Sequence, residues 1–124
     1  MLMRLNHVIV YTSDMQRSIA FYRDTLGFPV KMESSGWTEF HSGATTLALH
    51  HAKPAERPRL AHGETKAGEA HLGLEVLDIE KFYQEKKAKG VEFTMPPTLR
   101  EFGRKLAVFV DPDGLPISVT EEVR

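Results

Sequence analysis

The chain has 124 residues, of which 41% are hydrophobic and 27% charged, so it is long enough for one globular domain with a hydrophobic core. Its 16 basic and 17 acidic residues give a formal net charge of -1 without long blocks of one sign, which indicates neither nucleic-acid nor anionic-membrane binding. The absence of cysteine excludes disulfides, thiolate catalysis and cysteine-ligated zinc. No apolar run is long enough for a signal peptide or membrane span, so we expect a cytoplasmic protein that binds a small molecule or another protein.

The first half of the chain predicts a strand, a helix and three more strands. The segment NHVIVYTSD (6–14) alternates like a strand and ends at Asp14, whose carboxylate is a natural N-cap for a helix. Apolar residues then recur with helical spacing, and Gly27 follows as a left-handed C-cap: Met15, Ile19, Tyr22 and Leu26. Three strand-like runs complete this half: 29–34, 37–42 and 45–51.

The second half repeats this order after a connector rich in proline, glycine and charge at residues 53–69. The segment AHLGLEVLD (70–78) predicts a strand, Asp78 an N-cap and Gly90 a C-cap. The predicted helix presents Ile79, Phe82, Tyr83 and Lys86 on one face. Strand-like runs follow at 91–95, 105–110 and 116–122.

The two halves share their spacing, because His7 precedes Asp14 and His71 precedes Asp78 by the same seven residues. We therefore predict an α+β fold made of two βαβββ modules with mixed sheets, module 1 at 1–52 and module 2 at 70–124. The whole chain, 1–124, is expected to form one domain. Sheets that are covered by helices on one side should leave a concave ligand cleft on the other.

Strand alternation assigns each histidine to a face. Val8 and Val10 form the aliphatic side of the first strand and should pack under the helix, which leaves His7 on the opposite face. In LALHHAK (47–53) the same rule puts Leu47 and Leu49 under the helix. It therefore places His50, and not His51, on the face of His7.

The ordered motifs NHVIVYTSDMQRSIAFYRDTLGF, AHLGLEVLD and VFVDPDGLPISV resemble the vicinal oxygen chelate superfamily, which contains glyoxalase I, bleomycin resistance proteins and extradiol dioxygenases. In metal-dependent relatives each module supplies one ligand from its first strand and one from its last. The resemblance matches His7 and His71 to the opening ligands, whereas Ala48 and Ser118 stand where the last-strand ligands, usually including glutamate, would be. It therefore disfavours standard glyoxalase I activity, which is understood to need both a divalent ion and a carboxylate.

Two functions remain open on this resemblance. One is an enzyme, a metal-dependent lyase or dioxygenase, that holds a divalent Zn, Ni, Fe or Mn ion with His7, His71 and a displaced ligand such as His50, Glu75 or Glu122. The other is a metal-free binding protein that sequesters an amphipathic or aromatic compound, as in antibiotic resistance. The retained histidines favour chemistry, and the missing carboxylates favour binding.

The candidate ligand-binding residues combine aromatic and polar side chains that could line the cleft, because aromatic walls provide contact area at modest entropic cost. They are Tyr11, Trp37, His50, Phe102, Phe109 and Ser118. For Phe109 ordinary core packing is nearly as good an interpretation. Glu39 and Arg104 are further polar candidates, for which we expect a solvated surface.

We predict a homodimer, because the resemblance implies that small two-module relatives pair so that modules from different chains form each cleft. Sedimentation at micromolar concentration should then give twice the mass of the 14.0 kDa chain. A 14.0 kDa monomer under these conditions would contradict the prediction and favour a cleft formed within one chain.

Overall fold

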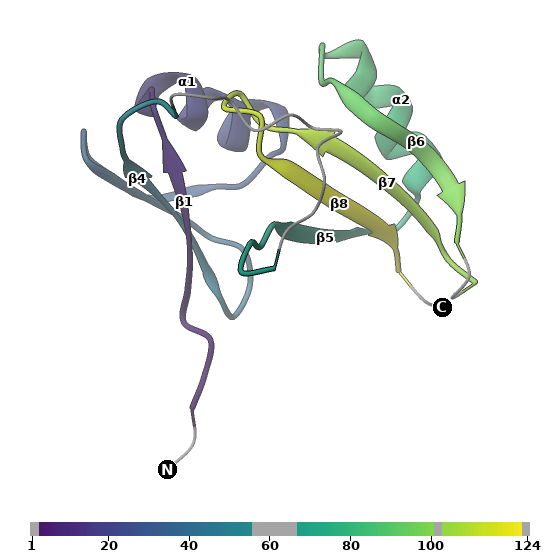
Figure 1. Ribbon diagram of the computed structural model, residues 1–124, viewed down its shortest axis with the longest axis horizontal. Helices are drawn as coiled ribbons and strands as arrows, with labels where there is room; N and C mark the ends of the chain where they lie inside the picture. Colours follow the sequence, from purple (N-terminus) through teal and green to yellow (C-terminus); the bar gives the residue numbers. More distant parts are fainter. Residues whose placement is uncertain (1–2, 56–66, 101–102, 123–124) are drawn as a thin grey trace. The chain divides into compact units, whose positions relative to one another are not determined.

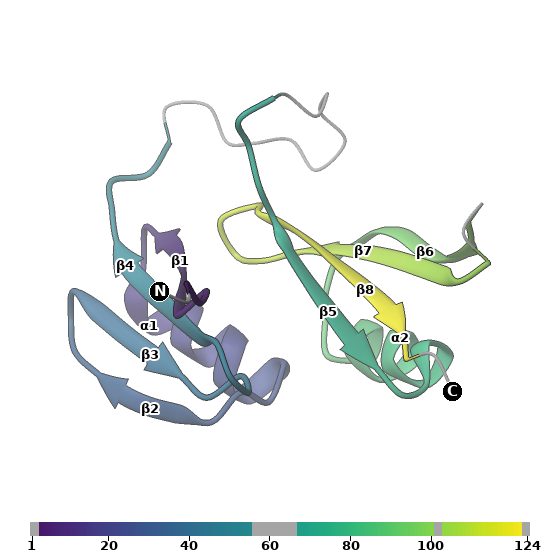
Figure 2. The same ribbon diagram turned by 90° about the horizontal axis from the view of Figure 1, so that it is seen from below.

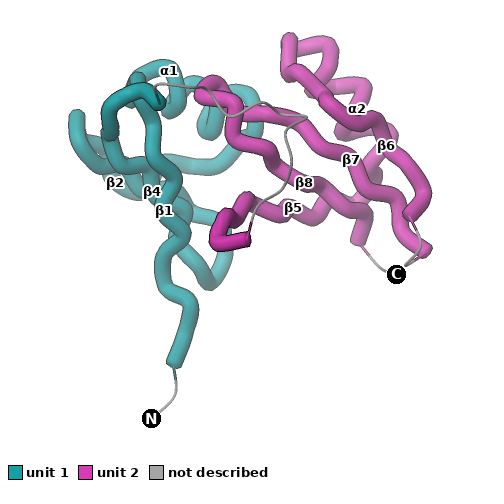
Figure 3. Tube along the Cα trace, in the orientation of Figure 1, with its two compact units in different colours: residues 1–56 teal, residues 57–124 magenta. Residues whose placement is uncertain are grey.

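The computed structural model describes residues 3–55, 67–100 and 103–122. The chain forms two compact units, Met1–Glu56 and Arg57–Arg124, coloured separately in Figure 3. Each unit has one four-stranded mixed sheet and the order strand, helix and three strands. The prediction of an α+β fold with two βαβββ modules is confirmed. Most of the predicted connector, 56–66 of 53–69, lies outside the described residues.

Unit 1 contains a sheet in the order β1-β4-β3-β2 (Figure 1). Strand β1 runs parallel to β4, and the other neighbours are antiparallel. The elements are β1 (His7–Thr12), α1 (Met15–Ile19), the π-helical turn η1 (Ala20–Thr25), β2 (Val30–Glu33), β3 (Trp37–Phe40) and β4 (Thr46–His51).

Unit 2 contains the equivalent sheet in the order β5-β8-β7-β6, with β5 parallel to β8. The elements are β5 (Leu72–Val76), α2 (Ile79–Ala88), β6 (Phe93–Leu99), β7 (Lys105–Val110) and β8 (Pro116–Glu121). Figure 2 shows that α2 lies against one face of this sheet, as α1 does in unit 1.

Both main helices begin as the sequence predicts. The Asp14 carboxylate accepts from the backbone N–H of Arg17 at 3.1 Å, and that of Asp78 accepts from Lys81 at 3.0 Å. Each bond satisfies an amide of the first turn that has no partner within the helix. Gly27 and Gly90 follow the helical segments with φ of 91° and 87°, the left-handed conformation that glycine adopts without a Cβ penalty.

Two local features were not predicted. The first helix widens into the π-helical turn η1, where the backbone N–H of Leu26 donates to the carbonyl of Phe21, five residues earlier. Strand β6 extends through Pro96 and Pro97 to Leu99, beyond the predicted end at residue 95. Because β6 is an edge strand and its register with β7 shifts around the prolines, the missing N–H groups are tolerated.

The helix-covered side of each sheet forms its core. In unit 1, Tyr22 stacks near Phe40 with ring centroids 6.0 Å apart, over fully or almost fully buried residues that include Val10, Leu47 and Leu49. In unit 2 the core is built around Phe109, together with Ile79, Ala107, Ile117 and Val119. Burying this apolar area is the main stabilising term of each unit. No helix within the described ranges is long and apolar enough to cross a membrane.

Candidate functional site

Strand alternation leaves a set of polar and aromatic side chains on the face of the unit 1 sheet that lies opposite α1. The register pairs Tyr11 with His50, His50 with Trp37, and Ala48 with both Ile9 and Glu39. Paired residues direct their side chains to the same face of a sheet. We call this set the open face of unit 1: His7, Ile9, Tyr11, Trp37, Glu39, Ala48 and His50. Along β1 its members are exposed, 45% for Ile9 and 63% for Tyr11, whereas the intervening Val10 is buried.

Four rings form a continuous row on the open face. The ring centroids of Tyr11 and His50 lie 5.6 Å apart, those of His50 and Trp37 5.8 Å, and those of Trp37 and His7 6.1 Å. These spacings are within the range in which aromatic rings attract one another, and all three pairs are tilted or edge-to-face. The row therefore crosses β1, β4 and β3 and offers one contiguous wall of ring surface.

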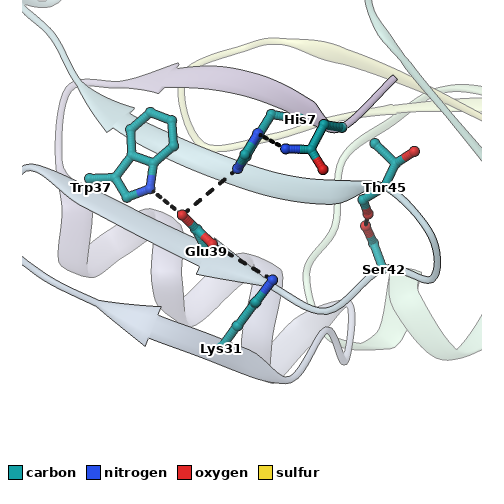
Figure 4. A network of polar contacts seen from close by, with 7 residues as sticks. His7, Lys31, Trp37, Glu39, Ser42 and Thr45 are labelled. Carbon is teal, nitrogen blue, oxygen red and sulfur yellow. Dashed lines mark hydrogen bonds and ion pairs between the residues drawn. The ribbon is translucent and has the colours of Figure 1, made fainter. Parts of the chain in front are cut away.

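A carboxylate lies beside this row. The indole Nε1–H of Trp37 donates to Glu39 Oε2 at 2.8 Å, His7 Nε2 lies 3.9 Å from the same oxygen, and Lys31 Nζ lies 4.0 Å from Oε1 (Figure 4). The Glu39 side chain is only 19% exposed. Our expectation of a solvated Glu39 is therefore wrong, because the side chain lies over the centre of the sheet and is fixed by the indole.

The hydrogen bond between Asn6 and His7 indicates which ring nitrogen of His7 carries the hydrogen. Asn6 Nδ2 lies 2.9 Å from His7 Nδ1. Because an amide NH₂ group can only donate, Nδ1 is the acceptor, and the neutral ring carries its hydrogen on Nε2. In this arrangement His7 directs an N–H, rather than a lone pair, toward Glu39.

The corresponding histidine of unit 2 has a different partner. His71 Nε2 lies within 2.8 Å of Ser118 Oγ, and Ser118 pairs with Gly73 across the parallel strands. Glu75 is exposed on the same face. The two histidines at equivalent positions of the repeat thus lie beside a carboxylate in one unit and a hydroxyl in the other.

The donor set at the four positions that the resemblance matches to metal ligands does not fit a catalytic divalent ion. It consists of two imidazoles, the Ala48 methyl group and the Ser118 hydroxyl, so no carboxylate is present at these positions. Both imidazoles also make hydrogen bonds to neighbouring side chains. Among the residues that the structure describes, no group of three His, Cys, Asp or Glu side chains could hold a metal ion.

The remaining candidates are placed as follows. Phe109 does not line the open side of its sheet: it is 0% exposed and packs between Phe82 of α2 and Phe93 of β6, at 5.8 and 5.5 Å. Its inclusion among ligand-binding residues is wrong, because its register partner Ile117 belongs to the helix-covered core. Phe102 lies outside the described residues, and His51 is exposed at the end of β4.

Two charged candidates in unit 2 differ in their surroundings. Glu122 is exposed just beyond β8. Arg104 is not simply solvated, as we expected, because its Nη2 donates to the carbonyl oxygen of Glu121 at 2.9 Å, and its Nε is buried with no hydrogen-bond partner among the described residues. The Arg104 guanidinium thus links the residue before β7 to the last residue of β8.

Two βαβββ units with histidines at the opening strands define the vicinal oxygen chelate class. The family described as the Glyoxalase/Bleomycin resistance protein/Dioxygenase superfamily matches residues 4–119, so the chain belongs to this superfamily. It is 30% identical to the metallothiol transferase FosB of Staphylococcus saprophyticus over 92% of this chain and 74% of that protein. It is also 30% identical to a bleomycin resistance protein of Klebsiella pneumoniae, over 82% of this chain and 79% of that protein. The crystal structure of SMU.1112c, 29% identical, superimposes with a TM-score of 0.83 over 98% of this chain and 100% of that one.

Exchange of single aromatic residues should distinguish the core from the open face. We expect Phe109→Ala to lower the free energy of unfolding by about 3–5 kcal/mol, because a large cavity opens in a closed core. Tyr11→Ala, at an exposed position, should lower it by about 1 kcal/mol or less. Urea unfolding followed by circular dichroism measures both; similar losses for the two variants would contradict the assigned faces.

Proposed function

We propose that the chain is a small-molecule-binding protein that holds its ligand on the open face of unit 1 without a resident divalent ion. The observation that carries the proposal is the row of four rings beside a partly buried carboxylate. Binding sites typically combine an apolar or aromatic wall with a few fixed polar groups, and this face has both.

The ring row has no role in the core of unit 1. The core is closed on the other side of the sheet by Tyr22, Phe40 and aliphatic residues, so the exposed rings do not contribute to it. Exposed aromatic side chains grouped on one face are characteristic of contact surfaces, and their ring area is released from water when a ligand covers it. This supports binding of an amphipathic or aromatic compound.

The donor chemistry supports sequestration rather than glyoxalase-type lyase chemistry. An ion held by two imidazoles alone would lack the carboxylate that moves a proton and balances the metal charge. The similarity to a bleomycin resistance protein also supports a binding role.

One observation favours a second function, that of a metal-dependent enzyme with a displaced site. His7 Nε2 and Glu39 Oε2 lie 3.9 Å apart, about 0.5 Å farther than two donors of a tetrahedral ion with bonds of about 2.1 Å, so a small side-chain shift would let both reach one ion. Rotation of the Asn6 amide by half a turn would present its oxygen to His7 Nδ1–H and free the Nε2 lone pair. Zn, Ni, Fe or Mn would then be held by these two residues, with a further ligand such as His50 still to be supplied.

Metal analysis combined with a binding assay separates the two functions. We expect protein purified without an affinity tag to contain well below one Zn, Ni, Fe or Mn ion per chain. It should bind 4-phenylbutanol, detected through the fluorescence of Trp37, which is the only tryptophan of the chain. Treatment with a chelator should leave this binding unchanged. About one tightly bound ion per chain, together with loss of binding after chelation, would overturn the proposal in favour of the metal-dependent enzyme.

The adjacent histidines provide a matched pair for the assigned face. Because the His50 ring contacts both Tyr11 and Trp37, we expect His50→Ala to weaken 4-phenylbutanol binding about three- to tenfold, with little loss of stability. His51→Ala, at an exposed position one residue further along, should leave binding unchanged. Fluorescence titration measures the affinity and thermal unfolding the stability; loss of binding in the His51 variant alone would reverse the assignment.

A further inference from the structure

We infer that the open face of unit 1 selects compounds that carry a protonated amine at one end of an apolar or aromatic body. This inference rests on the proposed small-molecule binding and adds the chemical class of the ligand. It follows from the hydrogen-bonding state of Glu39, from the identity of its neighbours and from the ring row that begins beside it.

Glu39 has one oxygen engaged and one available. Oε2 accepts the indole N–H of Trp37, whereas among the residues that the structure describes the cation paired with Oε1 is Lys31, whose Nζ lies 4.0 Å away and therefore beyond hydrogen-bonding distance. A carboxylate oxygen has room for two hydrogen bonds. The Glu39 side chain is only 19% exposed, so its carboxylate is already largely removed from water. A ligand that donates to Oε1 would supply the hydrogen bond that this oxygen lacks within the described part of the chain.

The neighbours of Glu39 do not neutralise it strongly. Lys31 is itself 47% exposed, so water screens its attraction at this distance. His7 Nε2 lies 3.9 Å from Oε2, which is beyond hydrogen-bonding distance. The face therefore retains a negative charge that attracts a cation and repels an anion.

The ring row supplies the rest of the site for such a ligand. Since the Trp37 indole donates directly to the carboxylate, ring surface and negative charge adjoin. An ammonium group near the face of a tryptophan ring gains a cation–π attraction in addition to its ion pair. The apolar body of the ligand can then lie along Trp37, His50 and Tyr11, whose rings follow one another at 5.6–5.8 Å.

Three probes that differ only in their end group test this inference: 4-phenylbutylamine, 4-phenylbutanol and 4-phenylbutyrate. Trp37 fluorescence is titrated at about pH 8, where imidazoles are neutral and a primary amine remains charged. We expect the wild-type protein to bind the amine at least about tenfold more tightly than the alcohol, and the carboxylate most weakly, because a hydrogen bond to a charged group is worth about a factor of ten or more.

Two variants remove one negative charge each from the same sheet. Glu39→Gln keeps an acceptor for the Trp37 N–H but loses the charge, so it should remove the preference for the amine over the alcohol. Glu33→Gln is the control, because Glu33 is exposed on β2 and pairs with Thr38 of the helix-covered face. It should preserve the preference for the amine.

The outcomes distinguish this inference from the proposal on which it rests. Equal binding of amine and alcohol to the wild-type protein, or equal loss of both in Glu39→Gln, would overturn the amine preference and leave small-molecule binding standing. Absence of binding by all three probes, with correctly folded protein shown by circular dichroism, would count against both. Loss of the preference in the Glu33 control would attribute it to overall charge and overturn the role of Glu39.

Discussion

Each sheet has one face that packs beneath a helix and one that does not, and this division governs where every side chain of the site lies. Side chains alternate along a strand, so every apolar residue that packs beneath a helix places its neighbours on the other side. In β4 this puts Leu47 and Leu49 in the core and Ala48 and His50 on the open face. The core of unit 1 therefore determines which groups are available for chemistry.

The two units share this framework, while the polar side chains on their open faces differ. His7 and His71 occupy equivalent positions, yet one faces Glu39 two strands away and the other contacts Ser118 on the strand paired with its own. The backbone requirements of the repeat are met in both units by an aspartate N-cap and a left-handed glycine. Superfamily membership therefore fixes the scaffold, while individual side chains decide what each face can bind.

The sequence predicted those features that depend on local periodicity. The strand faces, the two N-caps and the two C-terminal glycines could all be read within single segments. The proximity of Glu39 to His7 could not, because it depends on the register between β3 and β4 and on the order β1-β4-β3 across the sheet. The core position of Phe109 could not be predicted for the same reason, because it depends on the pairing of β7 with β8 and on packing beneath α2.

Glu39 could take part in either of the two proposed kinds of binding, that of a metal ion or that of an organic cation. Ala48 of β4 is fully buried and pairs with Ile9 on β1 and with Glu39 on β3. The Glu39 carboxylate therefore lies one strand away from position 48, which the resemblance matches to a metal ligand. Whether that carboxylate serves a metal or an organic cation depends on the hydrogen of His7. With the Asn6 amide donating to Nδ1, His7 Nε2 holds a hydrogen and has no lone pair for an ion. Because Trp37 donates to the same carboxylate from the other side, negative charge and ring surface adjoin on the open face, and this arrangement supports the proposed binding of an organic cation.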